Sequence, residues 1–355
     1  MKSVRIITKA LAALIILCAA NACSPTPAKL NFRPDGSFKI LQLTDLHLQL
    51  FHPDQIADVF ARMDSLVRRT DPDLITVTGD LIYSSPADTL MQMIVDRLDS
   101  YSRPWSIVYG NHDHEHGRTL AELARIITAG KHTINTLNAE GTLADFEIPV
   151  YSHRIPAAYL FFMDSHAYAT DPTNPGKFSY AWFEPEQVEW VRTTAGKHRD
   201  TPSIAFFHIP FPEYADAARL CDLTPSLTTE IHLPSFTGTF GEWVCCPKFN
   251  SGMFGAMLQT GFIATFCGHD HDNDFAALYS KASPSNTVMP APDRASSRPL
   301  LLCYGRYSGS NGEYNHLPKG ARLITLHSSG SLETCILDTS GTPSNQVQLN
   351  QPISL

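Results

Sequence analysis

Short apolar runs recur along the chain, and most of them lead directly into polar residues. The runs span 40–43, 74–77, 105–109, 160–163, 204–207, 262–266 and 300–304. Uninterrupted apolar runs of this length are typical of strands that are buried on both faces. Between the early runs lie two helix-like stretches, 55–68 and 89–98, and in the first Ile56, Val59 and Met63 recur at helical spacing. The pattern therefore predicts an α/β fold.

The later part of the chain has a different pattern. Two strand-like segments, 322–327 and 332–337, follow one another across a short turn of serine and glycine, which indicates an antiparallel hairpin. No repeat and no linker divides the core, so we expect one catalytic domain over 39–340. The final segment, 341–355, is rich in Pro, Gln and Asn and is predicted to be a flexible tail.

The N-terminus has the features of a targeting segment. Three basic residues precede an apolar stretch over 10–20, which is too short to span a bilayer comfortably. Residues 1–22 are therefore predicted to be a signal peptide.

The residues that follow this stretch suggest how the chain is anchored. The sequence Ala20-Asn21-Ala22-Cys23 resembles a bacterial lipobox, in which the cysteine is lipidated after cleavage. We expect a lipid on Cys23, a tether and lead-in over 23–38, and an outer-membrane or periplasmic lipoprotein. Because Asn21 is an imperfect lipobox residue, cleavage after Ala22 and simple secretion is the alternative. Both interpretations place the protein outside the cytoplasm.

Composition restricts the possible partners. The chain has 355 residues, 43% of them hydrophobic and 17% charged, with a formal net charge of −8 and no block of like charges. This balance argues against a nucleic-acid groove, so any binding of phosphate must be local. Six cysteines lie beyond the leader and the anchor, and none has the paired spacing of a zinc site, so we interpret them as structural.

The chemistry is concentrated where the apolar runs end. The first run closes with Asp45 and His47, which at strand spacing face the same side. The second closes with Gly79-Asp80, where the glycine lets the backbone approach closely. Three further runs end in polar motifs, namely Gly110-Asn111-His112-Asp113, Phe207-His208 and Gly268-His269-Asp270-His271. Because α/β proteins place their sites at the carboxyl ends of strands, we expect these side chains to meet.

In order, these motifs carry a resemblance to a known family. The series D-x-H, G-D, G-N-H-D, H and G-H-x-H resembles the calcineurin-like metallophosphoesterase superfamily, which includes the purple acid phosphatases. Secreted purple-acid-phosphatase-like proteins share further details, found here at 32–36, 208–210, 250–252 and 268–275. The resemblance covers nearly the whole mature chain and implies a four-layer α/β/β/α sandwich of two mixed sheets.

The resemblance also implies a dinuclear metal centre. One ion would be held by Asp45, His47 and His271, the other by Asn111, His208 and His269, and Asp80 would bridge both. Mixed imidazole and carboxylate ligation suits two divalent or trivalent ions of Fe, Mn or Zn better than Ca or Mg. The family's histidine outside the ligand set corresponds to His112, which would steady the transition state or protonate the leaving oxygen.

Other residues near the motifs receive less specific interpretations. Tyr83 fits a G-D-x-x-Y motif whose tyrosine binds ferric iron, but that tyrosine accompanies D-x-G, whereas this chain has D-x-H. We therefore expect Tyr83 to pack beside the ligands. The loop 114–116 is interpreted as solvated, and Arg306 either lies on the surface or holds a phosphate oxygen.

These expectations converge on a metal-dependent phosphoric ester hydrolase. A phosphomonoesterase that uses a metal-bridging hydroxide on a small-molecule ester is the first choice, and a phosphodiesterase with the same centre is the alternative. A non-catalytic, lipid-anchored binding protein would be expected to have lost ligands, and every ligand position is filled. The acidic net charge opposes a nuclease.

Overall fold

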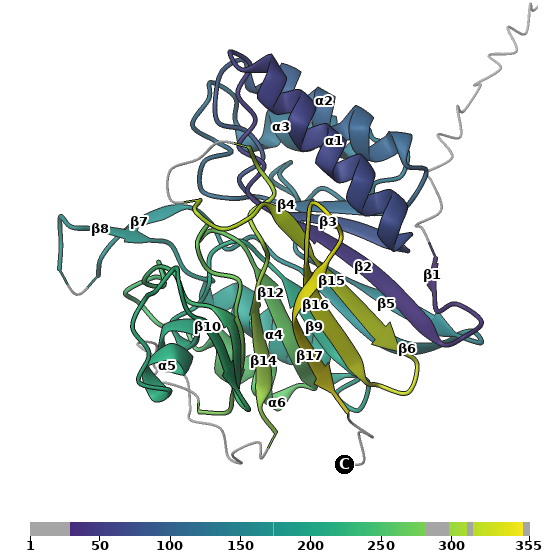
Figure 1. The fold of residues 1–355 in the computed structure, drawn as a ribbon, viewed down its shortest axis with the longest axis vertical. Coiled ribbons are helices and arrows are strands. Elements are labelled where there is room, and N and C mark those ends of the chain that lie inside the picture. Colours follow the sequence, from purple (N-terminus) through teal and green to yellow (C-terminus); the bar gives the residue numbers. More distant parts are fainter. Residues whose placement is uncertain (1–28, 173, 282–297, 311–314, 351–355) are drawn as a thin grey trace, which may run out of the picture.

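The computed structural model describes residues 29–172, 174–281, 298–310 and 315–350. Within these residues the chain forms two large sheets and one small one (Figure 1). In spatial order, the six-stranded sheet contains β17 (Pro343–Leu349), β16 (Leu332–Asp338), β15 (Gly320–His327), β2 (Ser37–Leu43), β3 (Leu74–Thr78) and β4 (Trp105–Val108). The nine-stranded sheet contains β1 (Leu30–Asn31), β5 (Phe146–Ser152), β6 (Ile155–Phe162), β9 (Ser203–Phe206), β12 (Phe262–Cys267), β14 (Leu300–Tyr304), β13 (Ala276–Tyr279), β11 (Phe236–Thr239) and β10 (Glu230–Leu233).

The strands are apolar on both faces because each large sheet is covered on both sides. On β9, Ile204 and Phe206 belong to the core between the two sheets, whereas Ala205 belongs to the core on the outer side. On β2, Ile40 faces the inter-sheet core and Leu41 faces the opposite way. Side chains alternate across a strand, so an uninterrupted apolar run supplies both cores.

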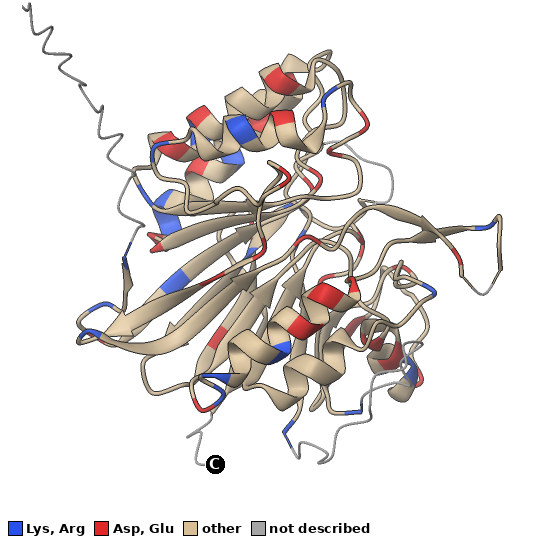
Figure 2. Cartoon of the chain, turned by 180° about the vertical axis from the view of Figure 1, so that it is seen from behind, with Lys and Arg blue, Asp and Glu red and all other residues tan. Residues whose placement is uncertain are grey.

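Helices cover the outer faces. Three of them, α1 (Pro53–Thr70), α2 (Ala87–Ser100) and α3 (Leu120–Thr128), pack on the six-stranded sheet. Three more, α4 (Pro185–Gly196), α5 (Glu213–Leu220) and α6 (Met253–Gln259), pack on the nine-stranded sheet. The described residues thus form the predicted four-layer α/β/β/α sandwich. In Figure 2 the positions of acidic and basic residues are interspersed along the helices and loops, whereas the strands carry few of them.

Parallel pairing brings the motif-bearing ends together. In the six-stranded sheet β2, β3 and β4 run parallel, and in the nine-stranded sheet β6, β9, β12 and β14 run parallel. The motifs identified in the sequence follow β2, β3, β4, β9 and β12, so they leave the two sheets at their carboxyl ends. A separate two-stranded arm, β7 (Tyr168–Thr170) with β8 (Phe178–Tyr180), projects from the body of the molecule (Figure 1).

The predicted hairpin over 322–337 is confirmed, but the prediction of a flexible tail over 341–355 is wrong for residues 343–349, and residues 351–355 lie outside the described part of the chain. Residues 343–349 form β17, which pairs antiparallel with β16. Val347 and Leu349 pack against the inter-sheet core, and Asn345 Nδ2 donates to Asp274 Oδ1 at 2.9 Å. Alternating side chains let a largely polar segment pair at a sheet edge while burying one face.

The predicted signal peptide over 1–22 and the predicted lipid attachment at Cys23 lie outside the described residues. Within the described part of the chain, no helix is both long and apolar enough to cross a membrane.

Candidate metal centre

The loops after β2 and β3 hold each other in place through their backbones. The Asp45 N–H donates to the carbonyl of Gly79, and the His47 N–H donates to the carbonyl of Asp80, both at 3.0 Å. Asp45, His47 and Asp80 have φ values of 54°, 47° and 51°, and His269 has 82°. Residues other than glycine seldom adopt this left-handed conformation, and backbone strain of this kind gathers at functional sites. Four of the predicted ligands therefore sit on strained backbone.

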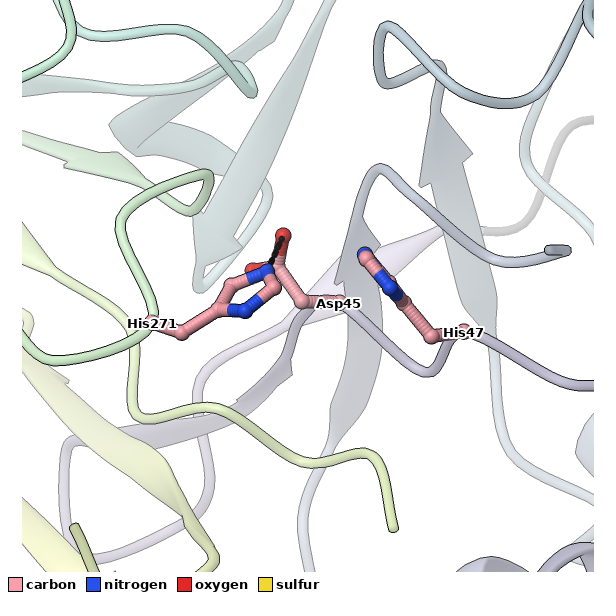
Figure 3. A group of neighbouring side chains, drawn as sticks. All are labelled: Asp45, His47 and His271. Carbon is pink, nitrogen blue, oxygen red and sulfur yellow. Dashed lines mark ion pairs between the residues drawn. The ribbon is translucent and has the colours of Figure 1, made fainter. Parts of the chain in front are cut away.

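One group of potential ligands contains Asp45, His47 and His271. Figure 3 shows the three side chains converging from the loops after β2 and β12. Nε2 of His271 lies 3.6 Å from Oδ1 of Asp45, and the His47 and His271 rings are 4.8 Å apart at their centroids. Asp45 and His47 are only 1% and 5% exposed. The ligand atoms of the group all lie within 4.8 Å of one another, so one ion could contact all three.

A second group contains Asp80, His208 and His269, whose ligand atoms also lie within 4.8 Å of one another. His208 Nδ1 donates to the carbonyl of Thr78 at 2.7 Å, which directs Nε2 toward the site. This Nε2 lies 3.2 Å from Oδ2 of Asp80 and 3.1 Å from Oδ1 of Asn111. Asn111, predicted from the G-N-H-D motif, thus lies beside this group.

Asp80, a member of the second group, also reaches the first group. Its Oδ2 is 3.4 Å from Nε2 of His47 in the first group and 3.2 Å from Nε2 of His208 in the second. One carboxylate oxygen therefore reaches both sets of donors. All seven predicted ligand residues are brought into one buried cluster.

The polar atoms of this cluster fit a cation. Both ring nitrogens of His47 and Nε2 of His269 are buried without a hydrogen-bond partner. Burial lowers the pKa of His269 to about 3, so this imidazole is neutral and offers a lone pair. Burial alone would lower the pKa of His208, but the adjacent Asp80 carboxylate outweighs it and raises the pKa to about 10. The neutral His269 imidazole beside buried carboxylates fits the donor set of a transition-metal site, and His208 would give up its Nε2 proton on binding an ion.

Glycines leave room for these approaches. An added Cβ at Gly79 would lie 2.5 Å from Cγ of His208, and one at Gly268 would lie 2.8 Å from Oδ2 of Asp45. At Gly110 it would lie 2.7 Å from Cγ of Asp80. Each motif glycine thus adjoins a potential ligand that a side chain would displace.

Asp113 supports the site in a way that the sequence motif did not reveal. Its Oδ2 accepts from the Gly110 N–H at 2.8 Å, and its Oδ1 accepts from the Leu81 N–H at 2.8 Å. It therefore ties the loop after β4 to the loop after β3. Burial, and then the nearby Asp80, raises the pKa of this carboxyl to about 7.

Aromatic residues enclose the cluster. Tyr83 stacks on His47, with centroids 4.8 Å apart and planes inclined by 16°, which fits its predicted packing role. Tyr180 of the β7–β8 arm lies edge-on to His269 at 4.4 Å, and Tyr168 accepts a hydrogen bond from Asn111 Nδ2 at 2.9 Å. No sequence motif pointed to the two arm tyrosines, because their partners lie far away along the chain.

Arg306 has a different environment from either of those expected. Its guanidinium is buried against the Asp274 carboxylate and also donates to the carbonyl of Pro318. It is therefore neither a surface residue nor free to take a phosphate oxygen.

A third set of possible ligands, Glu242, Cys245 and Asp270, lies next to the G-H-x-H motif. The Asp270 carboxylate already accepts from the Tyr304 hydroxyl at 2.5 Å and from the Asn273 amide at 3.2 Å. These bonds explain its burial without an ion.

Comparison with known proteins agrees with this geometry. The profile of the calcineurin-like phosphoesterase family matches residues 38–273, from β2 through the G-H-x-H motif. The chain belongs to the calcineurin-like phosphoesterase family. The match contains all seven residues of the candidate centre.

Relatives within the family are similar to this chain over most of its length. "Probable inactive purple acid phosphatase 28" of Arabidopsis thaliana is 29% identical over 291 residues, which cover 69% of this chain and 68% of that protein. "Phosphatase DCR2" of Saccharomyces cerevisiae is 26% identical over 306 residues, which cover 78% of this chain and 49% of the yeast protein. The chain thus spans about half the length of the yeast phosphatase.

Among solved structures, the purple acid phosphatase PPD1 of yellow lupin matches with a TM-score of 0.47 and 11% identity, covering 88% of this chain and 53% of that one.

Proposed function

We propose that this calcineurin-like phosphoesterase is a phosphomonoesterase with a dinuclear metal centre. The observation that carries the proposal is the position of Asp80, whose Oδ2 lies 3.4 Å from one group of donors and 3.2 Å from the other. A carboxylate shared by two donor groups is what a pair of ions a few ångströms apart requires.

Each predicted ligand has a place in this proposal. Asp45, His47 and His271 would hold one ion, Asn111, His208 and His269 would hold the other, and Asp80 would serve both. When bound, Fe, Mn or Zn ions supply Lewis-acid polarisation of the phosphoryl oxygens and activation of a water molecule.

His112 is the proposed proton donor to the leaving oxygen. Its backbone N–H donates to Oδ1 of Asp80 at 2.9 Å, and its ring lies 5.6 Å from that of His47. Its side chain is 25% exposed, so a bound ester can reach it. A sheltered but accessible imidazole beside a phosphoryl site is suited to protonating an alkoxide as it departs.

Metal analysis combined with a substrate panel tests the proposal. We expect purified protein, reconstituted with Zn, Mn or Fe, to hold about two ions per chain and to hydrolyse p-nitrophenyl phosphate faster than its bis-p-nitrophenyl diester. Removal of the ions with a chelator should abolish turnover, and adding them back should restore it.

Two other outcomes would assign a different function. Faster cleavage of the diester would make the protein a phosphodiesterase with the same centre. Full metal occupancy without turnover of either ester would make it a binding protein, a possibility raised by relatives whose names describe them as probably inactive.

A further inference from the structure

The Glu115 carboxylate is held between two side chains at the edge of the candidate centre. Its Oε2 lies 2.7 Å from Nδ1 of His112, and its Oε1 accepts a hydrogen bond from the Tyr168 hydroxyl at 2.9 Å. The Glu115 N–H also donates to the His112 carbonyl at 3.1 Å, forming a turn that brings the two side chains together. Glu115 is therefore an ordered part of the site, although its loop was expected to be solvated.

The Tyr168 hydroxyl also connects Glu115 to Asn111, a predicted metal ligand. The Tyr168 hydroxyl accepts from Nδ2 of Asn111 at 2.9 Å, while Oδ1 of Asn111 lies 3.1 Å from Nε2 of His208. Because the amide nitrogen is occupied by Tyr168, the amide oxygen faces the second donor group. One carboxylate thus connects the proposed proton donor with a proposed ligand.

We propose that Glu115 is a positioning residue that sets the tautomer of His112 directly and the amide orientation of Asn111 through Tyr168. A carboxylate can only accept from Nδ1, so the proton on that nitrogen is fixed and Nε2 is left to exchange a proton with the ester. This inference rests on the proposed function, in which His112 protonates the leaving oxygen. Partners that orient catalytic or ligating groups in this way commonly contribute about 10- to 100-fold to activity or metal affinity.

Two esters with different leaving groups provide the kinetic test. In Glu115→Ala we expect kcat for an alkyl phosphate such as ethyl phosphate to fall by about 10- to 100-fold. The kcat for p-nitrophenyl phosphate should fall less, because nitrophenolate departs without a proton. Glu115→Gln should recover part of the loss, since its amide oxygen can still accept from Nδ1 of His112.

Tyr168→Phe separates the effect of Glu115 on His112 from its effect on Asn111. It leaves the Glu115–His112 contact in place but removes the partner of the Asn111 amide. We expect weaker zinc binding in a titration and an unchanged preference between the two esters. Glu186→Ala is the matched control for Glu115→Ala, because Glu186 is exposed on α4 on the outer side of the nine-stranded sheet. It should change neither zinc binding nor the preference between the two esters.

A spectroscopic readout does not depend on turnover. In the zinc-loaded chain, ¹⁵N signals of the His112 ring should show the proton on Nδ1 in the wild type and in Glu115→Gln, and a mixture of tautomers in Glu115→Ala. The His112 signals can be assigned from their disappearance in His112→Gln. An unchanged tautomer in Glu115→Ala, or equal slowing of both esters, would overturn the inference.

Failure of the proposed function can be distinguished from failure of this inference. If the zinc-loaded wild type hydrolyses neither ester, the phosphatase proposal is wrong, while the tautomer of His112 still reports whether Glu115 positions it.

Discussion

Oδ2 of Asp80 and Nε2 of His208 lie 3.2 Å apart, although β3 and β9 belong to different sheets. His208 also donates from Nδ1 to the carbonyl of Thr78, the last residue of β3, at 2.7 Å. The candidate centre is therefore the place where the carboxyl ends of two parallel strand sets meet. Its geometry depends on how the sheets pack, so substitutions of the ligand residues should lower metal content and stability together.

Replacing Asp80 tests whether it contacts both ions. Asp80→Asn preserves the shape of the side chain but removes its charge, so we expect metal content to fall below one ion per chain. Asp45→Asn is the matched comparison and should leave about one ion per chain, because Asp45 was assigned to one donor group, whereas Oδ2 of Asp80 lies near nitrogens of both groups. Elemental analysis of the purified variants measures both. Equal metal loss in the two variants would show that Asp80 serves a single ion.

Replacing two histidines separates ligation from catalysis. His269→Ala removes a buried nitrogen of the second donor group, so metal content and thermal stability should fall together. His112→Ala should leave both ions in place and lower kcat for an alkyl phosphate by about 10²- to 10⁴-fold. Elemental analysis and steady-state kinetics check the pair. Loss of an ion in His112→Ala, or equal slowing of alkyl and nitrophenyl esters, would contradict its assignment as the proton donor.

Gly268→Ala tests the close approach of the two sheets at the site. The new Cβ would lie 2.8 Å from Oδ2 of Asp45 and 2.9 Å from the carbonyl oxygen of Thr78. Overpacking of this kind should lower the free energy of unfolding by about 1–3 kcal/mol, measured by urea denaturation of the metal-free chain.

Gly196→Ala is the control for this substitution. Gly196 ends α4, and an added Cβ there meets nothing within 4 Å, so stability should stay the same or rise slightly. If Gly268→Ala leaves the free energy of unfolding unchanged, the loop after β12 can move away from Asp45 and Thr78 at no cost in stability.

The proposed lipid anchor is tested at Cys23. Cys23→Ala should leave an uncleaved precursor or release soluble protein, and the proposed phosphatase activity should survive because Cys23 lies before β1, the first of the described strands, and far from the candidate centre in the sequence. Detergent partitioning and the mass of the N-terminal fragment measure the change. Membrane partitioning that does not change in the variant would refute the lipoprotein proposal and leave secretion or another anchor.

The sequence by itself predicted the α/β layers and the members of the candidate cluster. Apolar runs such as 74–77 and 204–207 identify strands because a strand between two cores must be apolar on both faces. Asp80 and His208 follow these runs directly, so their place at the strand ends is a local property of the chain. The order of such motifs was enough to indicate the family.

Local pattern failed where a segment depends on distant partners. Residues 343–349 appear too polar for a strand, yet they pair with β16 because their few apolar side chains meet the inter-sheet core. Arg306 was predicted to lie on the surface or to hold a phosphate oxygen, but it is buried against the carboxylate of Asp274. In both cases the partner decides the environment, and it lies elsewhere in the sequence.

Tertiary structure alone decided which polar side chains act together. It placed Oδ2 of Asp80 between two donor groups, and it linked Glu115 to His112 and Tyr168. The reason is physical: hydrophobic periodicity specifies which face of an element is buried, but it carries no information about distances between polar atoms on different elements. Those distances are set by sheet packing and by strained loops, where burial makes each polar contact strong and each missing one costly.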